Sequence, residues 1–207
     1  MLSAIDALKC LREGNQRFAS NRATGSAFAT TARRAELVTG QEPFAVVLGC
    51  SDSRVPAELV FDQGFGDLFV IRVAGNIVAP SQVGSVEFAA ARFGTRLVVV
   101  MGHTQCGAIG ATLDDLQGRA TTDSRNLRSI VDRIRPTLQT LLALNPGRDP
   151  DTLRHAAVRA NVRASVDHLR HGSALLEDLI LTDDLLVVGA EYSLDTGVVD
   201  FFDGVPA

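Results

Sequence analysis

The 207-residue sequence contains no tryptophan, a single tyrosine and only three cysteines. It also lacks any apolar run near the ~20 residues that a membrane-spanning helix needs. Its first residues do not show the basic segment and long apolar segment of a secretory signal. The sequence has 20 Lys and Arg residues against 24 Asp and Glu residues, and its basic residues form no block. The chain therefore lacks the clustered positive charge that is expected of a protein that binds nucleic acid or an anionic membrane. We therefore expect a cytoplasmic protein that binds neither nucleic acid nor membrane.

The composition is that of an ordinary compact enzyme, with 46% hydrophobic and 21% charged residues. A chain of this length can bury one sizeable core without splitting, so we expect a single domain over residues 1–207. Near its start, Ser3 and Asp6 are suited to cap a helix, and apolar residues follow at helical spacing. Polar residues 19–31 show no clear periodicity. We expect residues 1–31 to form an N-terminal helical arm and its exposed connection.

Short apolar runs bounded by glycine or polar residues occur at residues 44–48, 68–71, 97–101 and 185–188. Runs of this kind are typical of strands that are buried on both faces of a parallel sheet. Residues 192–202 can return as a further strand, because residues 195–197 have the composition of a turn. We therefore predict four parallel strands plus a C-terminal edge strand.

Helical patterns alternate with these runs, at residues 83–93, 108–116, 124–144 and 152–181. We expect Pro136 to kink the third of these helices and residues 145–147 to end it. The predicted fold class is therefore α/β, with a central, mostly parallel β-sheet flanked by helices and preceded by the N-terminal helical arm.

Two of the predicted strand ends carry residue types that bind metal. Cys50 follows the run at 44–48, and His103 and Cys106 follow the run at 97–101. In open α/β sheets, ligands bind outside the carboxyl ends of the strands, so two adjacent strands can deliver all three side chains. Zn²⁺ binds Cys sulfur and His nitrogen, and a catalytic zinc site keeps three protein ligands and one open position. We predict one Zn²⁺ per chain, bound by Cys50, His103 and Cys106, and no other cofactor.

Other cysteine chemistries fit this spacing less well. A phosphatase or sulfurtransferase loop would place Asp52 where an anion binds, and the carboxylate would repel that anion. A Cys–His nucleophile pair stays chemically open, but it leaves the second cysteine unexplained. A disulfide between Cys50 and Cys106 is disfavoured in a cytosolic protein. Cys10, on the first predicted helix, is interpreted as a packing residue.

The same residues form two motifs, C-x-D-x-R at 50–54 and H-x-x-C at 103–106. In this order, each after a strand, they resemble the hallmark of the β-class carbonic anhydrases. The similarity extends to residues 55–58, 69–72, 74–76 and 84–88, and it covers most of the chain up to Tyr192. The resemblance implies the reversible hydration of CO₂ to bicarbonate and a proton, by attack of zinc-bound hydroxide on CO₂. It also implies a homodimer or a multiple of dimers.

Asp52 and Arg54 belong to the first motif, and their charges point to control of the metal. Two thiolates donate more negative charge than imidazoles, so zinc-bound water should be less acidic than in the best-known sites, where its pKa is about 7. It then needs a nearby hydrogen-bond acceptor. Asp52 can fill that role if a bidentate pair with Arg54 keeps the carboxylate off the metal. Without that pair, Asp52 could become a fourth ligand in a closed state.

The resemblance further implies a narrow, largely apolar pocket for the substrate. Gln41, Phe69 and Ala74 match pocket positions of the family, and Phe88 stands where plant-like members often carry a tyrosine from a neighbouring subunit. Gly107 leaves room for close approach of backbone and metal, although it could equally ease a tight strand-to-helix junction. Core packing is the alternative interpretation for the apolar residues, and a solvated loop is the alternative for Gln41.

Some bacterial members of the family bind bicarbonate as an effector in a pocket made by Trp, Arg and Tyr. Arg72 and Tyr192 match two of these positions, but Val47 stands at the third. We predict no effector pocket of that type, because loss of the large aromatic wall leaves the anion poorly enclosed. The three histidines outside the motif, His155, His168 and His171, are interpreted as parts of a solvated helix surface.

Two alternative functions stay open at this point. The same scaffold could hydrolyse a CO₂-like molecule such as carbonyl sulfide or carbon disulfide, since small electrophiles leave little trace in a sequence. A zinc-stabilised or redox-sensing protein without catalysis is the second alternative. It would have no need for both Asp52 and Arg54.

Overall fold

The computed structural model describes residues 2–206 apart from 25–29, 121–123, 145–146 and 148. Its centre is a five-stranded sheet in the order β2-β1-β3-β4-β5. The strands are β1 (Ala45–Gly49), β2 (Leu68–Arg72), β3 (Leu97–His103), β4 (Leu186–Tyr192) and β5 (Val199–Asp203). β1 to β4 pair in parallel, and β5 pairs antiparallel with β4 at one edge. The predicted α/β fold class, with four parallel strands and a C-terminal edge strand, is confirmed.

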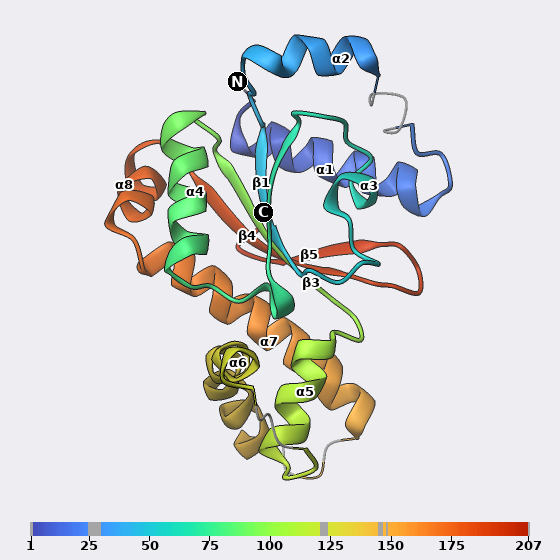
Figure 1. Ribbon diagram of the computed structural model, residues 1–207, viewed down its shortest axis with the longest axis vertical. Helices are drawn as coiled ribbons and strands as arrows, with labels where there is room; N and C mark the ends of the chain where they lie inside the picture. The colour runs from blue at the N-terminus through green and yellow to red at the C-terminus, as the bar shows by residue number, and fades with distance from the viewer. Residues whose placement is uncertain (1, 25–29, 121–123, 145–146, 148, 207) are drawn as a thin grey trace.

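Helices cover both faces of this sheet, and α5 and α6 extend below it in the view of Figure 1. They are α1 (Ala4–Ala19), α2 (Thr31–Glu36), α3 (Ala57–Val60), α4 (Pro80–Arg92), α5 (Gly107–Leu116), α6 (Arg125–Leu144), α7 (Pro150–His171) and α8 (Ala174–Thr182), with short 3-10 turns η2 (Leu37–Thr39) and η3 (Ala74–Asn76). Within the described parts of the chain, no helix combines the length and the apolar character needed to cross a bilayer.

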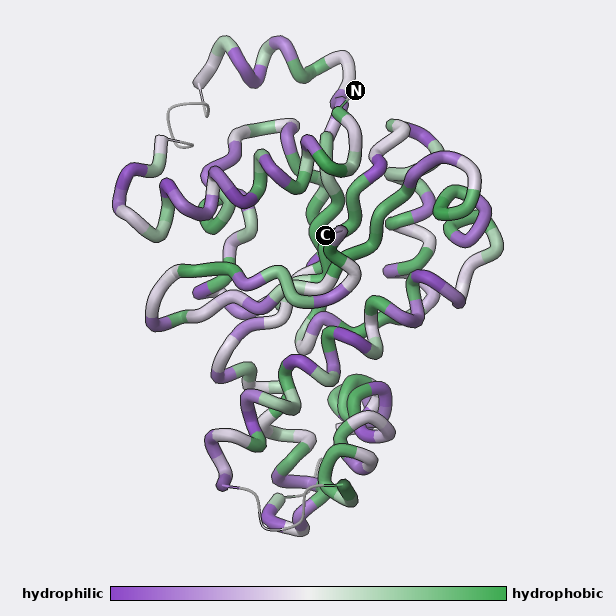
Figure 2. Tube along the Cα trace, turned by 180° about the vertical axis from the view of Figure 1, so that it is seen from behind, coloured by the Kyte–Doolittle hydropathy of each residue, from purple (hydrophilic) through white to green (hydrophobic). Residues whose placement is uncertain are grey.

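The strands contribute side chains to one apolar cluster on each face of the sheet, because successive side chains of a strand point to opposite faces. On β3, Val99 and Met101 pack with α1 and α3, whereas Val98 and Val100 pack with α4, α7 and α8. Every residue of β1 and β3 is buried, which explains why these strands read as continuous apolar runs. Figure 2 shows the hydrophobic residues concentrated along the central strands.

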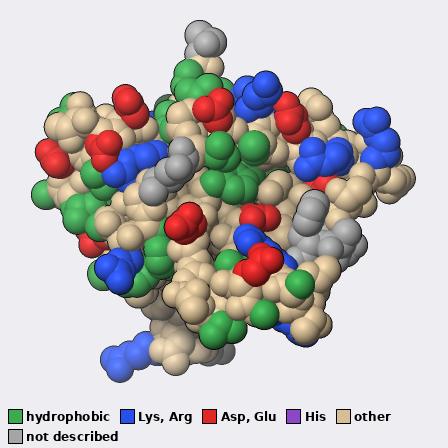
Figure 3. Space-filling model, turned by 90° about the horizontal axis from the view of Figure 1, so that it is seen from above, with side chains coloured by type: hydrophobic (Ala, Val, Ile, Leu, Met, Phe, Trp, Pro, Cys, Tyr) green, Lys and Arg blue, Asp and Glu red, His purple; other side chains and the backbone are tan. Residues whose placement is uncertain are grey.

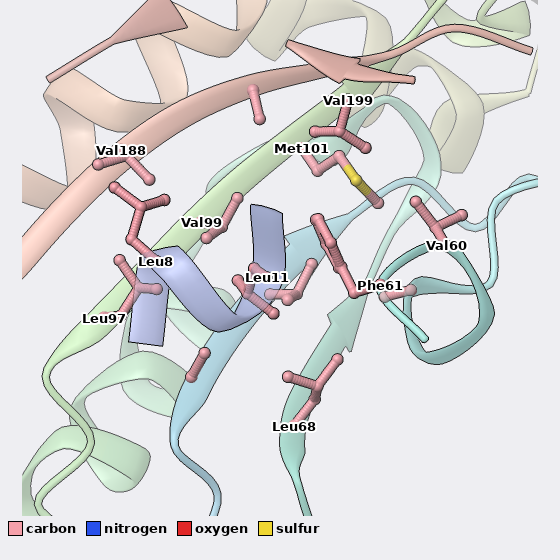
Figure 4. Packing of buried hydrophobic residues seen from close by; sticks show 14 of the residues in the cluster. Leu8, Leu11, Val60, Phe61, Leu68, Leu97, Val99, Met101, Val188 and Val199 are labelled. Atoms are coloured by element: carbon pink, nitrogen blue, oxygen red, sulfur yellow. The ribbon is translucent and has the colours of Figure 1, made fainter. Parts of the chain in front are cut away.

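Helix α1 packs against its own sheet. Its N-terminus is capped as predicted, with the Ser3 hydroxyl accepting a hydrogen bond from the Asp6 amide. Leu8 and Leu11 point into the cluster that also contains Phe61, as Figure 4 shows. The helix is therefore held by contacts within the chain, whatever else it touches in an assembly.

A third apolar cluster lies at the carboxyl ends of the strands. It joins Ile77 after η3 to α5, α6 and the beginning of α7, and it includes Cys50 and Cys106. The two cysteines of the motifs are thus backed by a packed lobe of helices, which excludes water behind them.

The predicted helix over residues 152–181 is in fact two helices. α7 ends at His171, and Ser173 begins α8 by accepting a hydrogen bond from the Leu176 amide. Its hydroxyl also donates to Glu87 on α4. Periodicity could not show this break, because both helices present apolar residues to the same cluster.

Three other expectations meet the structure only in part. Pro136 lies inside α6, which ends at Leu144, and residues 145–146 fall outside the described residues. Of the connection expected at 19–31, residues 25–29 are likewise outside the described residues. α2 follows it and was not predicted, because its polar sequence has no apolar face and none of its residues is buried.

Candidate metal centre

Two neighbouring strands bring together the three predicted ligands. Cys50 directly follows β1, His103 is the last residue of β3, and Cys106 caps the N-terminus of α5. β1 and β3 pair in parallel, so both strand ends lie at the same edge of the sheet. Cys106 is therefore one position before the first turn of α5.

The ligand atoms of Cys50, His103 and Cys106, here called the metal cluster, lie within 4.8 Å of one another. The two sulfur atoms are 4.0 Å apart. All three side chains are buried, and His103 is fully so. Two thiols and an imidazole held this close in a dry environment are the donor set that Zn²⁺ prefers.

The orientation of His103 provides an independent test of this fit. Its Nδ1 lies 2.9 Å from the carbonyl oxygen of Thr104, so Nδ1–H donates there and Nε2 carries the free lone pair. Nε2 is buried and has no hydrogen-bond partner among the described residues. A buried nitrogen without a partner is costly, and a cation between Nε2 and the two sulfurs would remove that cost. The residues present therefore fit a zinc ion.

The contact between the two cysteines shifts their pKa values in opposite directions. The hydrogen bond with Cys106 lowers the pKa of Cys50 below its ordinary value, and His103 and the Gly75 amide act in the same direction. The same contact with Cys50, together with burial, raises the pKa of Cys106. The opposite shifts describe one thiolate stabilised by one thiol. A bound cation would displace the remaining proton, because the thiolate is the form that binds metal.

Asp52 and Arg54 form the bidentate pair expected from the motif. Arg54 Nε lies 2.9 Å from Oδ1 of Asp52, and Nη2 lies 2.7 Å from Oδ2. The Arg54 amide also donates to Oδ1 at 3.0 Å. This guanidinium holds the pKa of the Asp52 carboxyl well below its usual range. Oδ2 of Asp52 is 3.8 Å from Nε2 of His103, so the carboxylate stands beside the metal cluster in its charged form.

Two further residues near the metal cluster were not predicted to act there. Arg72, at the end of β2, donates from Nε to the carbonyl oxygen of Cys50 at 3.0 Å and from Nη2 to that of Asp52 at 2.6 Å. The Gly75 amide lies 3.3 Å from the Cys50 sulfur. For Arg72 the sequence offered its place at the end of a predicted strand and its match to an effector position, and neither signal indicated that it would hold the Cys50 loop. For Gly75 the signal was a glycine directly after that strand, within the segment 74–76 that resembles the family.

The predicted pocket residues divide into two groups. Ala74 and Gly107 lie next to the metal cluster, in the turn after β2 and beside Cys106. A Cβ on Gly107 would meet no described atom within 4 Å, so this chain alone does not crowd that position.

Gln41, Phe69 and Phe88 lie elsewhere in the same chain. Gln41 lines a surface hollow with Phe65 and Phe93, before the start of β1 and away from the cysteine end of that strand. Phe69, Phe88 and Phe93 form an aromatic cluster with ring centroids 5.5 to 6.3 Å apart. Phe88 is 54% exposed in it. The structure of one chain does not bring these three residues to its own metal cluster.

The three residues that match positions of an effector pocket are buried or hydrogen-bonded within the chain. Val47 is fully buried in β1, and Tyr192 is buried beside Phe18, with ring centroids 6.4 Å apart. Arg72 is engaged by two backbone carbonyls, as described above. The absence of a bicarbonate pocket of the aromatic type stays a prediction from the sequence.

One of the histidines assigned to a solvated surface belongs to an ion network. His155 Nε2 lies 3.2 Å from buried Glu191 on β4, which also accepts a hydrogen bond from Arg159 at 2.7 Å. Arg159 reaches Asp200 on β5 as well. This network ties α7 to the edge of the sheet. His171 lies 3.6 Å from exposed Asp167 on the same helix.

Comparison with known proteins agrees with this geometry. The family model described as carbonic anhydrase matches residues 45–199. The chain is 37% identical over 196 residues to carbonic anhydrase 2 of Mycobacterium tuberculosis, covering 93% of this chain and 90% of that protein. Its fold resembles a β-carbonic anhydrase of Aspergillus fumigatus, with a TM-score of 0.76 at 23% identity, over 98% of this chain and 92% of the other. It also resembles a tetrameric β-carbonic anhydrase of Sordaria macrospora, with a TM-score of 0.74 at 22% identity, over 95% and 97% of the two chains.

Proposed function

The chain belongs to the β-class carbonic anhydrase family, and we propose that it catalyses the reversible hydration of CO₂ to bicarbonate and a proton at the metal cluster. The observation that carries this proposal is the buried Nε2 of His103, which has no hydrogen-bond partner in the described part of the chain and lies close to the sulfurs of Cys50 and Cys106. One Zn²⁺ per chain, held by these three residues, would supply the Lewis acid that makes water a nucleophile near neutral pH. No other cofactor is needed.

Asp52 is proposed to orient the attacking water and to accept a hydrogen bond from it. Its charged form suits this task, because Oδ1 accepts two hydrogen bonds from Arg54 whereas Oδ2 accepts one, which leaves a lone pair of Oδ2 available for the water. The same pair keeps Oδ2 at 3.8 Å from Nε2 of His103. Without Arg54, the carboxylate would be free to turn toward the cation position and close the site.

The carbonyls that Arg72 holds give the Cys50 to Asp52 loop a fixed shape. Since Cys50 is a ligand and Asp52 an acceptor, both depend on the position of the same short backbone segment. Arg72 is therefore proposed to position these two groups relative to each other rather than to bind an effector.

We further propose a homodimer or a multiple of dimers, in which a second copy completes the substrate pocket. Gln41, Phe69 and Phe88 then reach the metal cluster of the partner rather than their own. Phe88 and Phe65 are exposed in the single chain, and β2 is an unpaired edge of the sheet. On the face seen in Figure 3, hydrophobic side chains gather near the middle of the view, between charges of both signs. Exposed apolar patches often mark interaction sites.

The proposal is tested by metal analysis and stopped-flow CO₂ hydration on the zinc-loaded protein, with sulfide release from carbonyl sulfide and carbon disulfide measured in parallel. We expect one zinc per chain, CO₂ hydration, and loss of both metal and rate in Cys106→Ser. Full zinc content and full rate in Cys106→Ser would overturn the ligand assignment. Sulfide release without CO₂ hydration would instead indicate the alternative substrate. The cytoplasmic location stays a prediction from the sequence.

A further inference from the structure

The turn after β2 directs one backbone amide at a cysteine of the metal cluster. This turn, residues 73–77, is called the Gly75 turn below. Gly75 has φ +70° and ψ 19°, and the next residue, Asn76, has φ +42°. Backbone N–H groups in turns of this kind can form a concave surface that favours negative charge. The group it meets is the Cys50 sulfur, 3.3 Å from the Gly75 nitrogen.

Glycine needs external contacts to hold such an amide in one direction, because its backbone is the least restricted of all residues. On one side the Gly75 turn is enclosed by apolar groups. A Cβ at Gly75 would lie 2.9 Å from Cδ1 of Ile134 on α6 and 3.0 Å from Cβ of Ala108 on α5. These contacts exclude larger residues, but they cannot fix the rotation of a peptide group.

Two buried polar side chains of α7 hold the turn from the other side. Nδ2 of Asn161 donates to the carbonyl oxygen of Gly75 at 2.8 Å, and the Ser165 hydroxyl donates to the carbonyl oxygen of Asn76 at 3.0 Å. Asn161 is 3% exposed and Ser165 is 5% exposed. Burying an asparagine is costly unless its polar groups are hydrogen-bonded. Here the side-chain nitrogen of Asn161 donates to Gly75, the residue whose own N–H faces Cys50.

We propose that Asn161 is a positioning residue for the metal: it fixes the peptide group of the Gly75 carbonyl, which joins the peptide group of the Gly75 N–H at the Gly75 Cα, and so restrains that N–H against the Cys50 sulfur. An N–H···S hydrogen bond withdraws electron density from the thiolate, so it reduces the charge that Cys50 donates to a bound cation. Groups that hydrogen-bond metal ligands tune affinity in this way. The inference rests on the proposed zinc site and adds to it a residue that lies 86 positions from the turn it controls.

Ser165→Ala is a matched control for Asn161→Ala. It also removes one buried hydrogen bond between α7 and the Gly75 turn, but from the carbonyl of Asn76, whose amide donates to Val73 and not to a ligand. If α7 merely anchors the turn, the two variants should behave alike. If Asn161 acts through the Gly75 amide, only the Asn161 variant should alter the metal.

The experiment loads wild type, Asn161→Ala, Asn161→Leu and Ser165→Ala with Co²⁺ and records the near-ultraviolet thiolate-to-metal charge-transfer band. Metal affinity is measured by chelator competition, and folding by circular dichroism. In both Asn161 variants we expect the band to move to longer wavelength, since a thiolate without the hydrogen bond is easier to oxidise. We also expect metal affinity to fall by about 10- to 100-fold, because Cys50 is then no longer held in the orientation that binds the cation. Ser165→Ala should keep the wild-type band.

Asn161→Leu has almost the size of the original residue, cannot donate a hydrogen bond and adds no charge, so it carries the test if the alanine variant does not fold. Unchanged bands in the Asn161 variants, or equal shifts in Ser165→Ala, would overturn the positioning role while leaving the zinc site in place. A wild-type protein that binds no Co²⁺ would overturn both this inference and the proposed function.

Discussion

The guanidinium of Arg72 donates a hydrogen bond to the backbone carbonyl of Cys50, with Nε 3.0 Å from the oxygen, across the ends of two neighbouring strands. Its Nη2 donates to the carbonyl of Asp52 in the same loop. One planar group therefore holds the backbone on both sides of Ser51. This geometry cannot be reproduced by a lysine, whose ammonium is a point donor on a flexible stem.

We predict that Arg72→Lys retains the fold but loses about 1 to 2 kcal/mol of stability, the scale of one or two charge-assisted hydrogen bonds at a partly exposed site. Urea unfolding of the metal-free protein measures this directly. The exposed Arg92 on α4 serves as control, because Arg92→Lys should change the free energy of unfolding little. Equal losses in the two variants would show that Arg72 makes no special contribution.

The second prediction concerns the Asp52–Arg54 pair. Arg54→Ala should keep its zinc, because the three ligands are untouched, yet lower CO₂ hydration by about 10- to 100-fold. The physical reason is that the carboxylate loses the two side-chain hydrogen bonds that orient it. Metal analysis and stopped-flow hydration check both parts.

An Asp52→Asn background provides the control for this pair. If Arg54 acts only through Asp52, adding Arg54→Ala to Asp52→Asn should cause little further loss, since effects within one interacting pair are not additive. Full additivity, or a wild-type rate in Arg54→Ala, would contradict the pair mechanism.

The sequence allowed the sheet and the metal cluster to be predicted because both depend on short-range patterns. Buried parallel strands read as apolar runs, and residues directly after them share one edge of the sheet, so Cys50 and His103 could be brought together by topology alone. The C-terminal strand was recognised from the turn composition before it. These features need no knowledge of how helices pack.

The remaining features depend on contacts that no local pattern encodes. Asn161 meets Gly75 only because α7 crosses the carboxyl ends of the strands, and Arg72 meets Cys50 only because β2 is the neighbour of β1. Gln41 and Phe88 match a pocket by resemblance. Within one chain, however, Gln41 lies before the start of β1 and Phe88 lies on α4, away from the cysteines. Whether a second copy supplies them is a property of the assembly, which the order of residues does not reveal.

The third prediction tests how closely α7 approaches β3 just before His103. A Cβ on Gly102 would lie 2.6 Å from Cγ2 of Val162 and 3.1 Å from Cγ1 of Val158. Gly102→Ala should therefore cost about 1 to 3 kcal/mol, as other overpacked cores do. Urea unfolding is again the measurement.

Val162→Ala offers a specific rescue of Gly102→Ala. The smaller side chain makes room for the new methyl group, so the double variant should be more stable than the sum of the single losses predicts. If the losses in free energy of unfolding were strictly additive, the clash would be relieved elsewhere. The close approach of α7 would then not explain the glycine at position 102.

The fourth prediction concerns the attachment of α1. Buried Asn15 donates from Nδ2 to the carbonyls of Val60 and Gly197 at 3.1 and 2.9 Å, and its Oδ1 accepts from the Val199 amide at 2.8 Å. Asn15→Leu leaves these backbone groups unpaired and should cost at least about 1 to 3 kcal/mol. Glu13→Leu, at an exposed site of α1, is the control.

This variant also separates two roles of the first helix. If α1 serves mainly as an arm over a partner, Asn15→Leu should change the dimer without changing the unfolding of dilute protein. Light scattering and urea unfolding at several protein concentrations distinguish these outcomes. The contacts within the chain lead us to expect a loss of stability at every concentration.

The last prediction is a pH dependence at the start of α7, away from the metal. Asp149 caps this helix, its carboxylate accepting hydrogen bonds from the Thr152 amide at 2.9 Å and from the Thr152 hydroxyl at 2.6 Å. These bonds to the charged form lower the pKa of Asp149. A carboxylate whose pKa is lower in the folded chain stabilises it above the unfolded pKa, about 3.9 for Asp, and loses that contribution as the pH falls through the folded value.

Asp149→Ala should therefore be less stable than wild type at pH 7, and the gap should narrow as the solution is acidified below about pH 4. Asp149→Asn is the matched control, because it keeps an acceptor oxygen at the cap without a titrating charge. The difference in free energy of unfolding between Asp149→Asn and Asp149→Ala should not vary with pH. Urea unfolding of the three proteins from pH 7 down to pH 3.5 measures this difference and that between wild type and Asp149→Ala. A wild-type advantage that grows on acidification would reverse the sign required by the lowered pKa and would remove Asp149 as the group responsible.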